Sequence, residues 1–317
     1  MNSIRIGTRS SKLALVQARW VAQALEAAHP GLRAEIVTIR TSGDVHNTIP
    51  LPKVGTKGMF VKEIEDALLA DAVDVAVHSL KDLPGDLPEG LVLAAIPPRA
   101  DARDALVANK YTLDTLPDGA RIGTSSVRRK ALLTACRGDL RVEELRGNLD
   151  TRLRKLHEGR YDGLLVACAG LDRLGLGENI SQRLPLHLFV PAPGQGFLGL
   201  ECREDRPNIS RVLEPLSDAD AFLCASAERA FQRALGGGCS VPAGAFAQVN
   251  GDALTLKALL IAPDAAVILR SEVKGAPCDA EAIGARAAEE ILAQGGASLL
   301  RAAASDGTGS GLREVAE

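Results

Sequence analysis

Aromatic side chains are scarce in this chain of 317 residues: they make up 3% of it, and Trp20 is its single tryptophan. Proteins that hold single-stranded nucleic acid stack bases on exposed rings, so this scarcity argues against that class. The N-terminal segment lacks the apolar run of a signal peptide. No stretch approaches the roughly 20 apolar residues that cross a membrane. We therefore expect a cytoplasmic protein that binds neither nucleic acid nor membrane.

Paired cysteines are also missing. The chain has six cysteines, far apart, with no CxxC motif and no neighbouring histidine pair, so we expect neither disulfides nor a metal site. Cys239 differs from the others because it follows three glycines in the segment GGGCSVP. Glycines there would let the backbone approach another body closely and leave the sulfur accessible. Sequence alone leaves open whether this thiol is modified or inert.

Charge is distributed unevenly along the chain. The net charge is −3, yet residues 121–160 hold eleven Lys or Arg and five Asp or Glu, a local excess of +6. Hydrophobic residues make up 46% of the chain and charged residues 24%, as in ordinary globular proteins. A basic segment within an acidic protein indicates a local site for a polyanion.

Residues 73–84, VDVAVHSLKDLP, are the stretch around which we interpret the rest. Valines alternate with other residues from position 73 to 78, a period of two that predicts a β-strand. This strand leads directly to Lys81 and Asp82. Ligands of open α/β sheets bind beyond the carboxyl ends of the strands. The pair therefore marks a candidate active-site edge, although an exposed structural ion pair would give the same pattern.

Other strands end in the same way, at a hydroxyl or arginine cluster that begins a helix. In TRSS and TSSVRR, serine and threonine at the turn can cap the helix while backbone N–H groups and arginine offer an anion site. Arg128 and Arg129 lie at a helix N-terminus, where the dipole disfavours cations, so a bound anion would offset that penalty. A plain helix cap beside a surface arginine is the simpler alternative for TRSS alone. The predicted strands with such ends are residues 4–7, 121–123, 141–145 and 163–169.

The segment KVGTKGMF is a glycine-spaced loop that contains Lys53 and Lys57, ahead of a predicted amphipathic helix. It lacks the GxxxxGKS/T pattern of a nucleotide-binding P-loop. A basic lid over an anion site and a solvated surface loop account for it equally well.

Two proline-rich segments, at residues 97–101 and 190–196, predict that the chain leaves one domain, builds a second and returns. We expect domain 1 at 1–98 and 197–216, domain 2 at 99–196 and a smaller α+β domain at 217–317. Two lobes joined by two crossovers are typical of hinged binding proteins, whose ligand lies between the lobes.

Eight motifs in order, TRSSKLAL, KVGTKGMFVKE, DVAVHSLKDLP, GTSSVRR, LRGNLDTRL, AGLDRLG, PAPGQG and GGGCSVP, closely resemble the porphobilinogen deaminase (hydroxymethylbilane synthase) family. The resemblance spans residues 4 to about 300. It implies an α/β fold with two lobes of the type II periplasmic-binding-protein kind and a smaller C-terminal α+β domain. It also implies a monomeric transferase of tetrapyrrole and heme biosynthesis. Such enzymes join four porphobilinogen molecules into hydroxymethylbilane, release ammonia, and carry a covalent dipyrromethane cofactor.

The resemblance assigns roles residue by residue. Cys239 matches the cysteine that bears dipyrromethane through a thioether, and Asp82 matches the catalytic aspartate. A mobile loop over the cleft corresponds to Lys53, Lys57 and Phe60; Thr56 stands where the family has glycine. The remaining matches hold carboxylates: for the cofactor, Lys81, Thr124, Ser126, Arg128, Arg129 and Arg146; for the substrate, Arg9, Ser11, Arg152 and Arg173.

This resemblance accounts for the charge pattern, because each pyrrole carries two carboxylates and arginine binds carboxylates bidentately. An ionised Asp82 would stabilise the cation formed as ammonia leaves, and Cys239 would serve as an anchor. Two alternatives stay open at this point. One is a two-lobed protein that binds a small anion, and the other is a nucleic-acid binder that uses residues 121–160.

Overall fold

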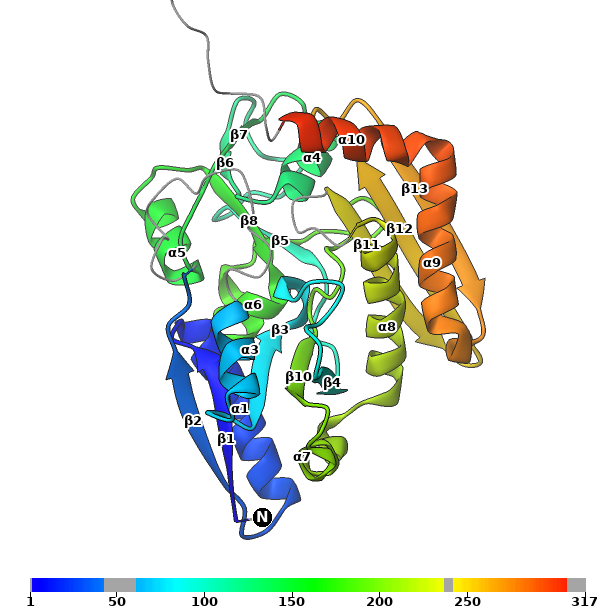
Figure 1. The fold of residues 1–317 in the computed structure, drawn as a ribbon. Coiled ribbons are helices and arrows are strands. Elements are labelled where there is room, and N and C mark those ends of the chain that lie inside the picture. The colour runs from blue at the N-terminus through cyan, green and yellow to red at the C-terminus, as the bar shows by residue number, and fades with distance from the viewer. Residues whose placement is uncertain (1, 43–60, 237–241, 307–317) are drawn as a thin grey trace, which may run out of the picture.

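The computed structural model describes residues 2–42, 61–236 and 242–306. Three sheets organise this part of the chain, and each has its own strands (Figure 1). The strands are β1 (Ser3–Arg9), β2 (Arg33–Ile39), β3 (Val75–Ser79), β4 (Leu91–Ala95), β5 (Asp104–Val107), β6 (Arg121–Gly123), β7 (Arg141–Glu143), β8 (Gly163–Ala167), β9 (Gln182–Arg183), β10 (Leu198–Arg203), β11 (Ala243–Asn250), β12 (Ala253–Ile261) and β13 (Ile268–Gly275).

The helices cover these sheets and include several short 3₁₀ segments. The α-helices are α1 (Lys12–Ala28), α3 (Lys62–Leu69), α4 (Val127–Cys136), α5 (Leu149–His157), α6 (Cys168–Arg173), α7 (Pro207–Leu213), α8 (Ala219–Ala234), α9 (Ala280–Ile291) and α10 (Ala297–Asp306). The 3₁₀ segments are η1 (Leu80–Asp82), η2 (Gly177–Asn179), η3 (Glu214–Leu216) and η4 (Pro277–Asp279), and a π-helical segment, η5 (Leu292–Gly296), joins α9 to α10. No described helix is long and apolar enough to cross a membrane.

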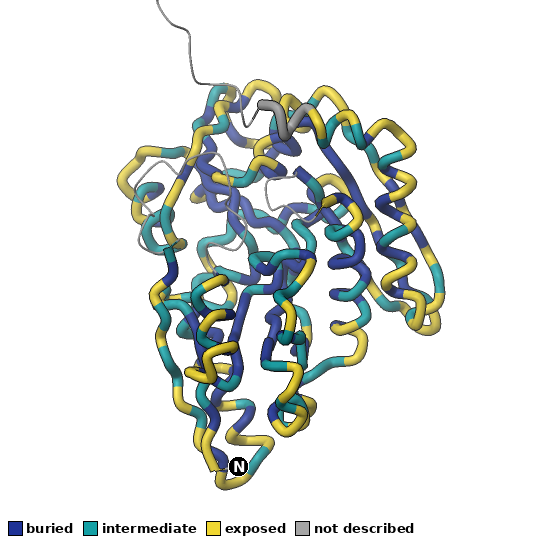
Figure 2. The backbone as a smooth tube through the Cα atoms, viewed as in Figure 1, coloured by how far each residue is buried: buried dark blue, intermediate teal, exposed yellow. Residues whose placement is uncertain are grey.

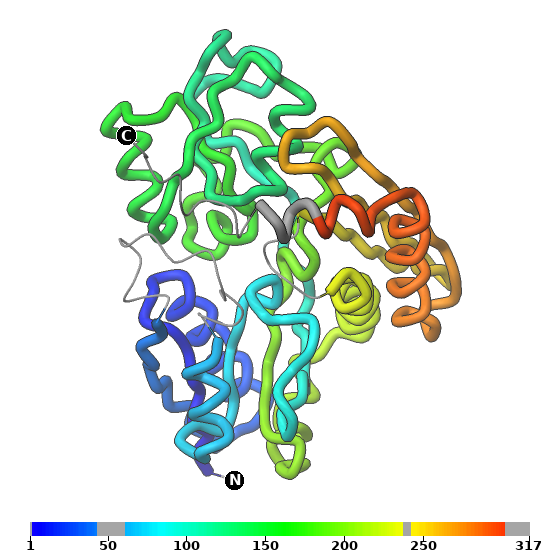
Figure 3. Tube along the Cα trace, turned by 45° about the horizontal axis from the view of Figure 1, so that its top comes forward, coloured from blue at the N-terminus to red at the C-terminus, as the bar shows by residue number. Residues whose placement is uncertain are grey.

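Two of the sheets have equivalent topologies. The first has strand order β2-β1-β3-β10-β4, and the second has order β7-β6-β8-β5-β9. In each sheet, three parallel strands lie next to one antiparallel strand. This antiparallel strand is β10 in the first sheet and β5 in the second, and the chain reaches each of them through a crossover. We call these two units the first and second lobe. Two α/β lobes joined by two crossovers are the architecture that the sequence predicted, and Figure 3 shows the lobes facing each other across the crossovers.

Each lobe buries apolar residues on both faces of its sheet. In the first lobe α1 and α7 cover one face and α3 covers the other. In the second lobe α4 packs on one face, and α5 with α6 on the other. The inner strands β3, β10, β5 and β8 are consequently buried along most of their length, whereas the edge strands β2 and β7 are more exposed (Figure 2).

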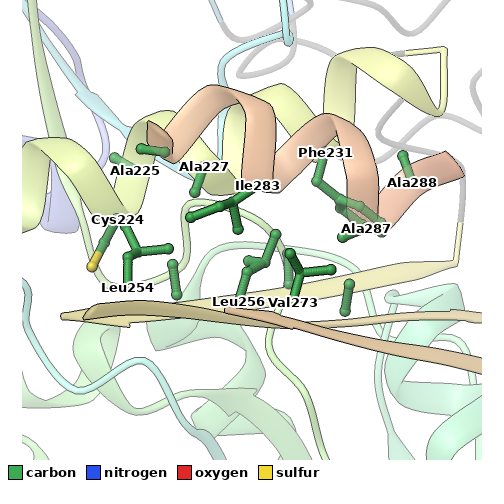
Figure 4. Packing of buried hydrophobic residues seen from close by; sticks show 14 of the residues in the cluster. Cys224, Ala225, Ala227, Phe231, Leu254, Leu256, Val273, Ile283, Ala287 and Ala288 are labelled. Atoms are coloured by element: carbon green, nitrogen blue, oxygen red, sulfur yellow. The ribbon is translucent and has the colours of Figure 1, made fainter. Parts of the chain in front are cut away.

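The third unit is a three-stranded antiparallel sheet, β11-β12-β13, with α8 and α9 on one face. Figure 4 shows the contact, where Phe231 and Ile283 of the helices pack over Leu256 and Val273 of the strands. The same core includes Leu80 of the first lobe. The opposite face contacts the second lobe through β12, whose Leu259 and Ile261 are buried there. The third unit therefore packs against both lobes.

Candidate active site

The structure places Asp82 at the end of the strand that the sequence singled out. β3 runs into η1, where Leu80 and Leu83 are fully buried and fasten the turn to the core. The amide of Leu80 donates to the carbonyl of Phe197 at 3.1 Å, which ties the turn to the segment that returns from the second lobe. Lys81 and Asp82, which lie between these two buried leucines, line a cleft.

This cleft lies between the lobes and has a volume of about 660 Å³. Its lining comes from the carboxyl ends of strands and the starts of the helices that follow, as the sequence predicted for an α/β sheet. The described polar side chains that line it are Arg9, Ser10, Ser11, Lys12, Ser79, Lys81 and Asp82 from the first lobe, and Ser125, Arg129, Glu144, Arg146, Asn148, Asp150 and Arg152 from the second.

Cations dominate this lining, with six Lys or Arg side chains against three carboxylates. Two of the carboxylates are already paired with a lining cation. Lys12 lies 3.5 Å from Asp150, an ion pair that joins the two lobes, and Arg146 donates to Glu144 at 2.6 Å. The remaining lining charge is positive, which would favour an anionic ligand.

The pKa values of two lining cations reflect this crowding. Burial and the charge of Arg129 lower the pKa of Lys81 to about 8, although Asp82 opposes the shift. Burial and Arg129 also lower the pKa of Arg152 to about 10. Carboxylates bound beside these two groups would raise both pKa values.

Arg129 is held from behind by a buried carboxylate. Asp104 of β5 accepts from Nε of Arg129 at 2.8 Å and from Nη1 of Arg128 at 2.8 Å. Burial alone would raise the pKa of Asp104, but the two arginines hold it below its ordinary value. Gln195 of the second crossover completes the arrangement, because its Nε2 donates to Asp104 and its Oε1 accepts from Arg129.

Several residues that the resemblance assigned to the site lie beside the cleft and do not line it. Arg128 is buried against Asp104 and the carbonyl of Val190. Ser126 caps α4, and its amide donates to Thr124 Oγ1 at 3.2 Å. Arg173 donates to the carbonyl of Gly196 at 2.7 Å, and burial lowers its pKa to about 10. Direct ligand contacts by these four stay predictions.

The positions of four other predicted residues lie outside the part of the chain that the structure describes. These are Lys53, Lys57, Phe60 and Cys239. Because the structure does not describe these residues, their assigned roles stay predictions.

Ser11 caps α1, accepting from the amide of Ala14 at 3.3 Å, as the sequence predicted.

The sequence interpretation missed residues that shape the site. Ser125 lines the cleft and accepts from Nη2 of Arg152 at 3.0 Å. Asn148 lines it and caps α5. Gln195 lay within the motif PAPGQG, which we interpreted only as a crossover. No local sequence pattern signals the role of Asp104, because its partners belong to α4 and to the second crossover.

The two crossovers meet at one carboxylate of the third unit. Glu228 of α8 is fully buried and accepts from Arg99 in the first crossover at 2.8 Å and from the amide of Gly194 in the second at 2.7 Å. It also accepts from the amide of Ala247 in β11 at 2.8 Å. The guanidinium of Arg99 lies over the ring of Phe197, 4.1 Å from its centroid. This contact fixes the geometry of the crossovers next to η1.

Comparison with known proteins identifies the family. Residues 4–211 match the family model described as porphobilinogen deaminase, dipyromethane cofactor binding domain, and residues 222–293 match its C-terminal domain. A porphobilinogen deaminase of Roseiflexus sp. (strain RS-1) is 50% identical over 93% of this chain and 97% of that protein. The corresponding protein of Syntrophotalea carbinolica is 49% identical over 95% of this chain and 96% of its own length. A solved Salmonella typhimurium periplasmic binding protein is 12% identical, with a TM-score of 0.37 over 68% of this chain and 92% of that one. The chain belongs to the porphobilinogen deaminase family.

Proposed function

We propose that this protein joins four porphobilinogen molecules head to tail into hydroxymethylbilane, with release of ammonia, on a dipyrromethane held by Cys239. The observation that carries the proposal is the position of Asp82, a carboxylate in a cleft whose other charges are mostly cationic. A chain of pyrroles bears two carboxylates per ring, and the cleft offers the matching cations.

The side chains present fit a dipyrromethane. Its four carboxylates need several cations at different depths, and Lys81, Arg129, Arg146 and Arg152 line the cleft from both lobes. Bound there, the group would supply the first nucleophilic ring carbon of the growing chain. Arg129 is preorganised by Asp104 and Gln195, so it loses little conformational freedom when it binds a carboxylate.

Asp82 has a separate role. As ammonia leaves porphobilinogen, positive charge develops on the pyrrole and its methylene carbon. A carboxylate beside the ring nitrogen stabilises that charge, and it can accept the proton that the attacking ring carbon loses. Lys81 would bind a carboxylate of the pyrroles. The two neighbouring side chains of η1, Lys81 and Asp82, thus have different roles.

Two variants test these roles. Asp82→Ala should lower turnover by about 100-fold or more while the cofactor stays attached. Cys239→Ser should give a protein with the mass of its sequence, whereas the wild type should be heavier by the dipyrromethane. Intact mass spectrometry and the colour reaction with Ehrlich's reagent measure the cofactor. A wild-type protein of unmodified mass that forms no hydroxymethylbilane from porphobilinogen would contradict the proposal.

We further propose the domain boundaries 1–98 with 197–216, 99–196 and 217–317, and a monomer in the cytoplasm. One chain supplies both walls of the cleft, which supports a monomer. The five described cysteines are free thiols, which suits a reducing compartment. Light scattering of the purified protein and fractionation of the source cells test these two points.

A further inference from the structure

One ion pair of the cleft joins side chains of the two lobes. Lys12 is the first residue of α1, and its Nζ lies 3.5 Å from Oδ1 of Asp150, in the first turn of α5. Both residues line the cleft, Lys12 from the first lobe and Asp150 from the second. Neither has a role in the chemistry at Asp82, and neither is part of a buried core.

The pair is loose and exposed to solvent. Its separation of 3.5 Å exceeds the roughly 2.7–2.9 Å of a charge-assisted hydrogen bond. The side chains of Lys12 and Asp150 are 63% and 43% exposed. A lysine ammonium has three N–H donors, so Lys12 has donors left for another carboxylate. Exposed ion pairs contribute little to stability, so this pair can separate at small cost.

The pair of Arg129 with Asp104 differs in each of these respects. Asp104 is fully buried and accepts from Nε of Arg129 at 2.8 Å. Separation of that pair would leave a carboxylate uncompensated in the interior, so the counter-charge of Arg129 is permanent. The cleft therefore contains a cation with a fixed counter-charge, Arg129, and a cation with an exchangeable one, Lys12.

The proposed reaction increases the number of carboxylates in the cleft while the number of cations stays constant. Each condensation adds one pyrrole ring with two carboxylates to the chain. Six Lys or Arg side chains line the described part of the cleft, and the dipyrromethane already needs several of them. A cation whose counter-charge can exchange is therefore suited to a carboxylate that arrives later.

We propose that Lys12 binds a carboxylate of the growing pyrrole chain, and that Asp150 is the internal counter-ion that this carboxylate displaces. Asp150 pairs with Lys12 again when the product leaves. It therefore competes with the substrate for one cation, and it limits how tightly the cleft holds a polyanion. The inference rests on the proposed function, since it needs a ligand that carries carboxylates.

The exchange does not require the lobes to separate. Leu13, the next residue of α1, lies near Gly170 of α6, where an added Cβ would be 3.7 Å from Leu13 Cδ2. This contact between α1 and α6 is apolar and does not involve the ammonium of Lys12. Rotation of two exposed side chains, Lys12 and Asp150, is enough for the ammonium to change its partner.

The test is the steady-state kinetics of the holoenzyme with porphobilinogen, in which the two partners should have opposite effects. Lys12→Met removes the cation, so kcat/KM should fall about 10-fold, mainly through a higher KM. Asp150→Asn removes the competitor, so kcat/KM should rise about 2- to 5-fold, the range expected for an exposed ion pair. Lys12→Arg keeps the charge and should retain most of the wild-type kcat/KM.

The mass of the protein provides a readout other than rate. The pyrrole chain stays attached through the cofactor until the product is released, so intact mass counts the rings that each molecule carries. At a porphobilinogen concentration below KM, Asp150→Asn should shift this distribution toward longer chains. Lys12→Met should shift it toward shorter chains.

Glu158→Gln is the matched control. It removes one negative charge just beyond the other end of α5, where Glu158 pairs with Arg160 and is not among the described residues that line the cleft. Its kcat/KM should equal that of the wild type. Asp150→Asn also loses a favourable charge in the first turn of α5, which should lower its thermal stability slightly. A loss of stability would not raise kcat/KM, so the two effects are separable.

Two outcomes would overturn the inference. If the ion pair were only structural, Lys12→Met and Asp150→Asn would both lower kcat/KM. If Asp150 acted only by long-range repulsion, Asp150→Asn would raise kcat/KM equally in the wild-type and the Lys12→Met backgrounds. The exchange predicts instead that Asp150→Asn has little effect once Lys12 is replaced. A wild type that forms no hydroxymethylbilane in the same assay would contradict the proposed function.

Discussion

Arg129 donates from Nε to Oδ1 of Asp104 at 2.8 Å, so a carboxylate of the protein itself lies at the start of α4. From the sequence we expected an external anion to offset the cost of arginines at that helix N-terminus. The structure shows that Asp104 supplies much of this compensation. Arg129 nevertheless lines the cleft, so it can serve an internal and an external carboxylate together.

Asp104→Asn should be strongly destabilising. The substitution leaves the buried guanidinium groups of Arg128 and Arg129 without their shared counter-charge, which costs about 3–5 kcal/mol. Chemical denaturation of the holoenzyme measures the loss. Glu158→Gln is the control, since its pair with Arg160 is exposed and should contribute less than about 1 kcal/mol. Equal losses for the two variants would show that Asp104 does not organise the arginines.

Gly194→Ala should lower kcat as well as stability. Gly194 has a φ of +77°, and a Cβ atom there would lie 2.9 Å from the backbone nitrogen of Lys81. The second crossover would have to move away from η1, and Asp82 would move with the turn. Gly175→Ala provides the control, because Gly175 has a φ of +69° and open space around it. Both variants should lose about 1 kcal/mol for the left-handed conformation, but only Gly194→Ala should lose activity. If the Gly194→Ala enzyme kept its activity, the second crossover would not be what positions the turn η1.

Lys81 should make cofactor uptake depend on pH. Its pKa of about 8 lies below the ordinary 10.5, so the ammonium form that binds a carboxylate is lost as pH rises above 8. Uptake of the dipyrromethane precursor by the apoprotein, followed by mass spectrometry, should therefore weaken between pH 8 and 10. In Lys81→Arg this weakening should vanish, because guanidinium does not titrate there.

The lowered pKa of Lys81 also predicts how the free energy of unfolding of the apoprotein changes with pH. Between pH 10.5 and 8 the unfolded chain binds the proton that folded Lys81 does not. The contribution of this group to the free energy of unfolding should thus fall as pH is lowered through that range. Comparison of the wild type with Lys81→Met by thermal unfolding isolates it. A pH-independent difference would indicate that Lys81 keeps an ordinary pKa.

Glu228→Ala should uncouple the crossovers from the third unit. It removes the partner of Arg99 and of two backbone amides in the interior, which should cost about 3–5 kcal/mol. Glu281→Ala is a matched control in the same unit, since its pair with Arg233 is exposed and should contribute less than about 1 kcal/mol. Limited proteolysis should cut Glu228→Ala in the crossovers faster than the control.

The fold was predictable where periodicity and helix caps agree. β6 coincides with the predicted strand at 121–123, and Ser11 caps α1. β11 was missed, because its sequence AGAFAQVN is rich in alanine and glycine and lacks a clear alternation. Asp82 and Arg129, which follow predicted strands in the sequence, both line the cleft. The roles of Glu228 and Gln195 were not predictable, since their partners come together only when three units pack.

β10 has a consequence for synthesis on the ribosome. It inserts between β3 and β4, yet about a hundred residues that build the second lobe separate it from β4 in the chain. At about 5–20 residues per second, the first sheet waits roughly 5–20 s for its inner strand. During that time β3 and β4 expose unpaired edges that invite wrong pairing. The second lobe can thus fold before the first. Until β10 is synthesised, a chaperone could bind the unpaired edges of β3 and β4 in the first lobe.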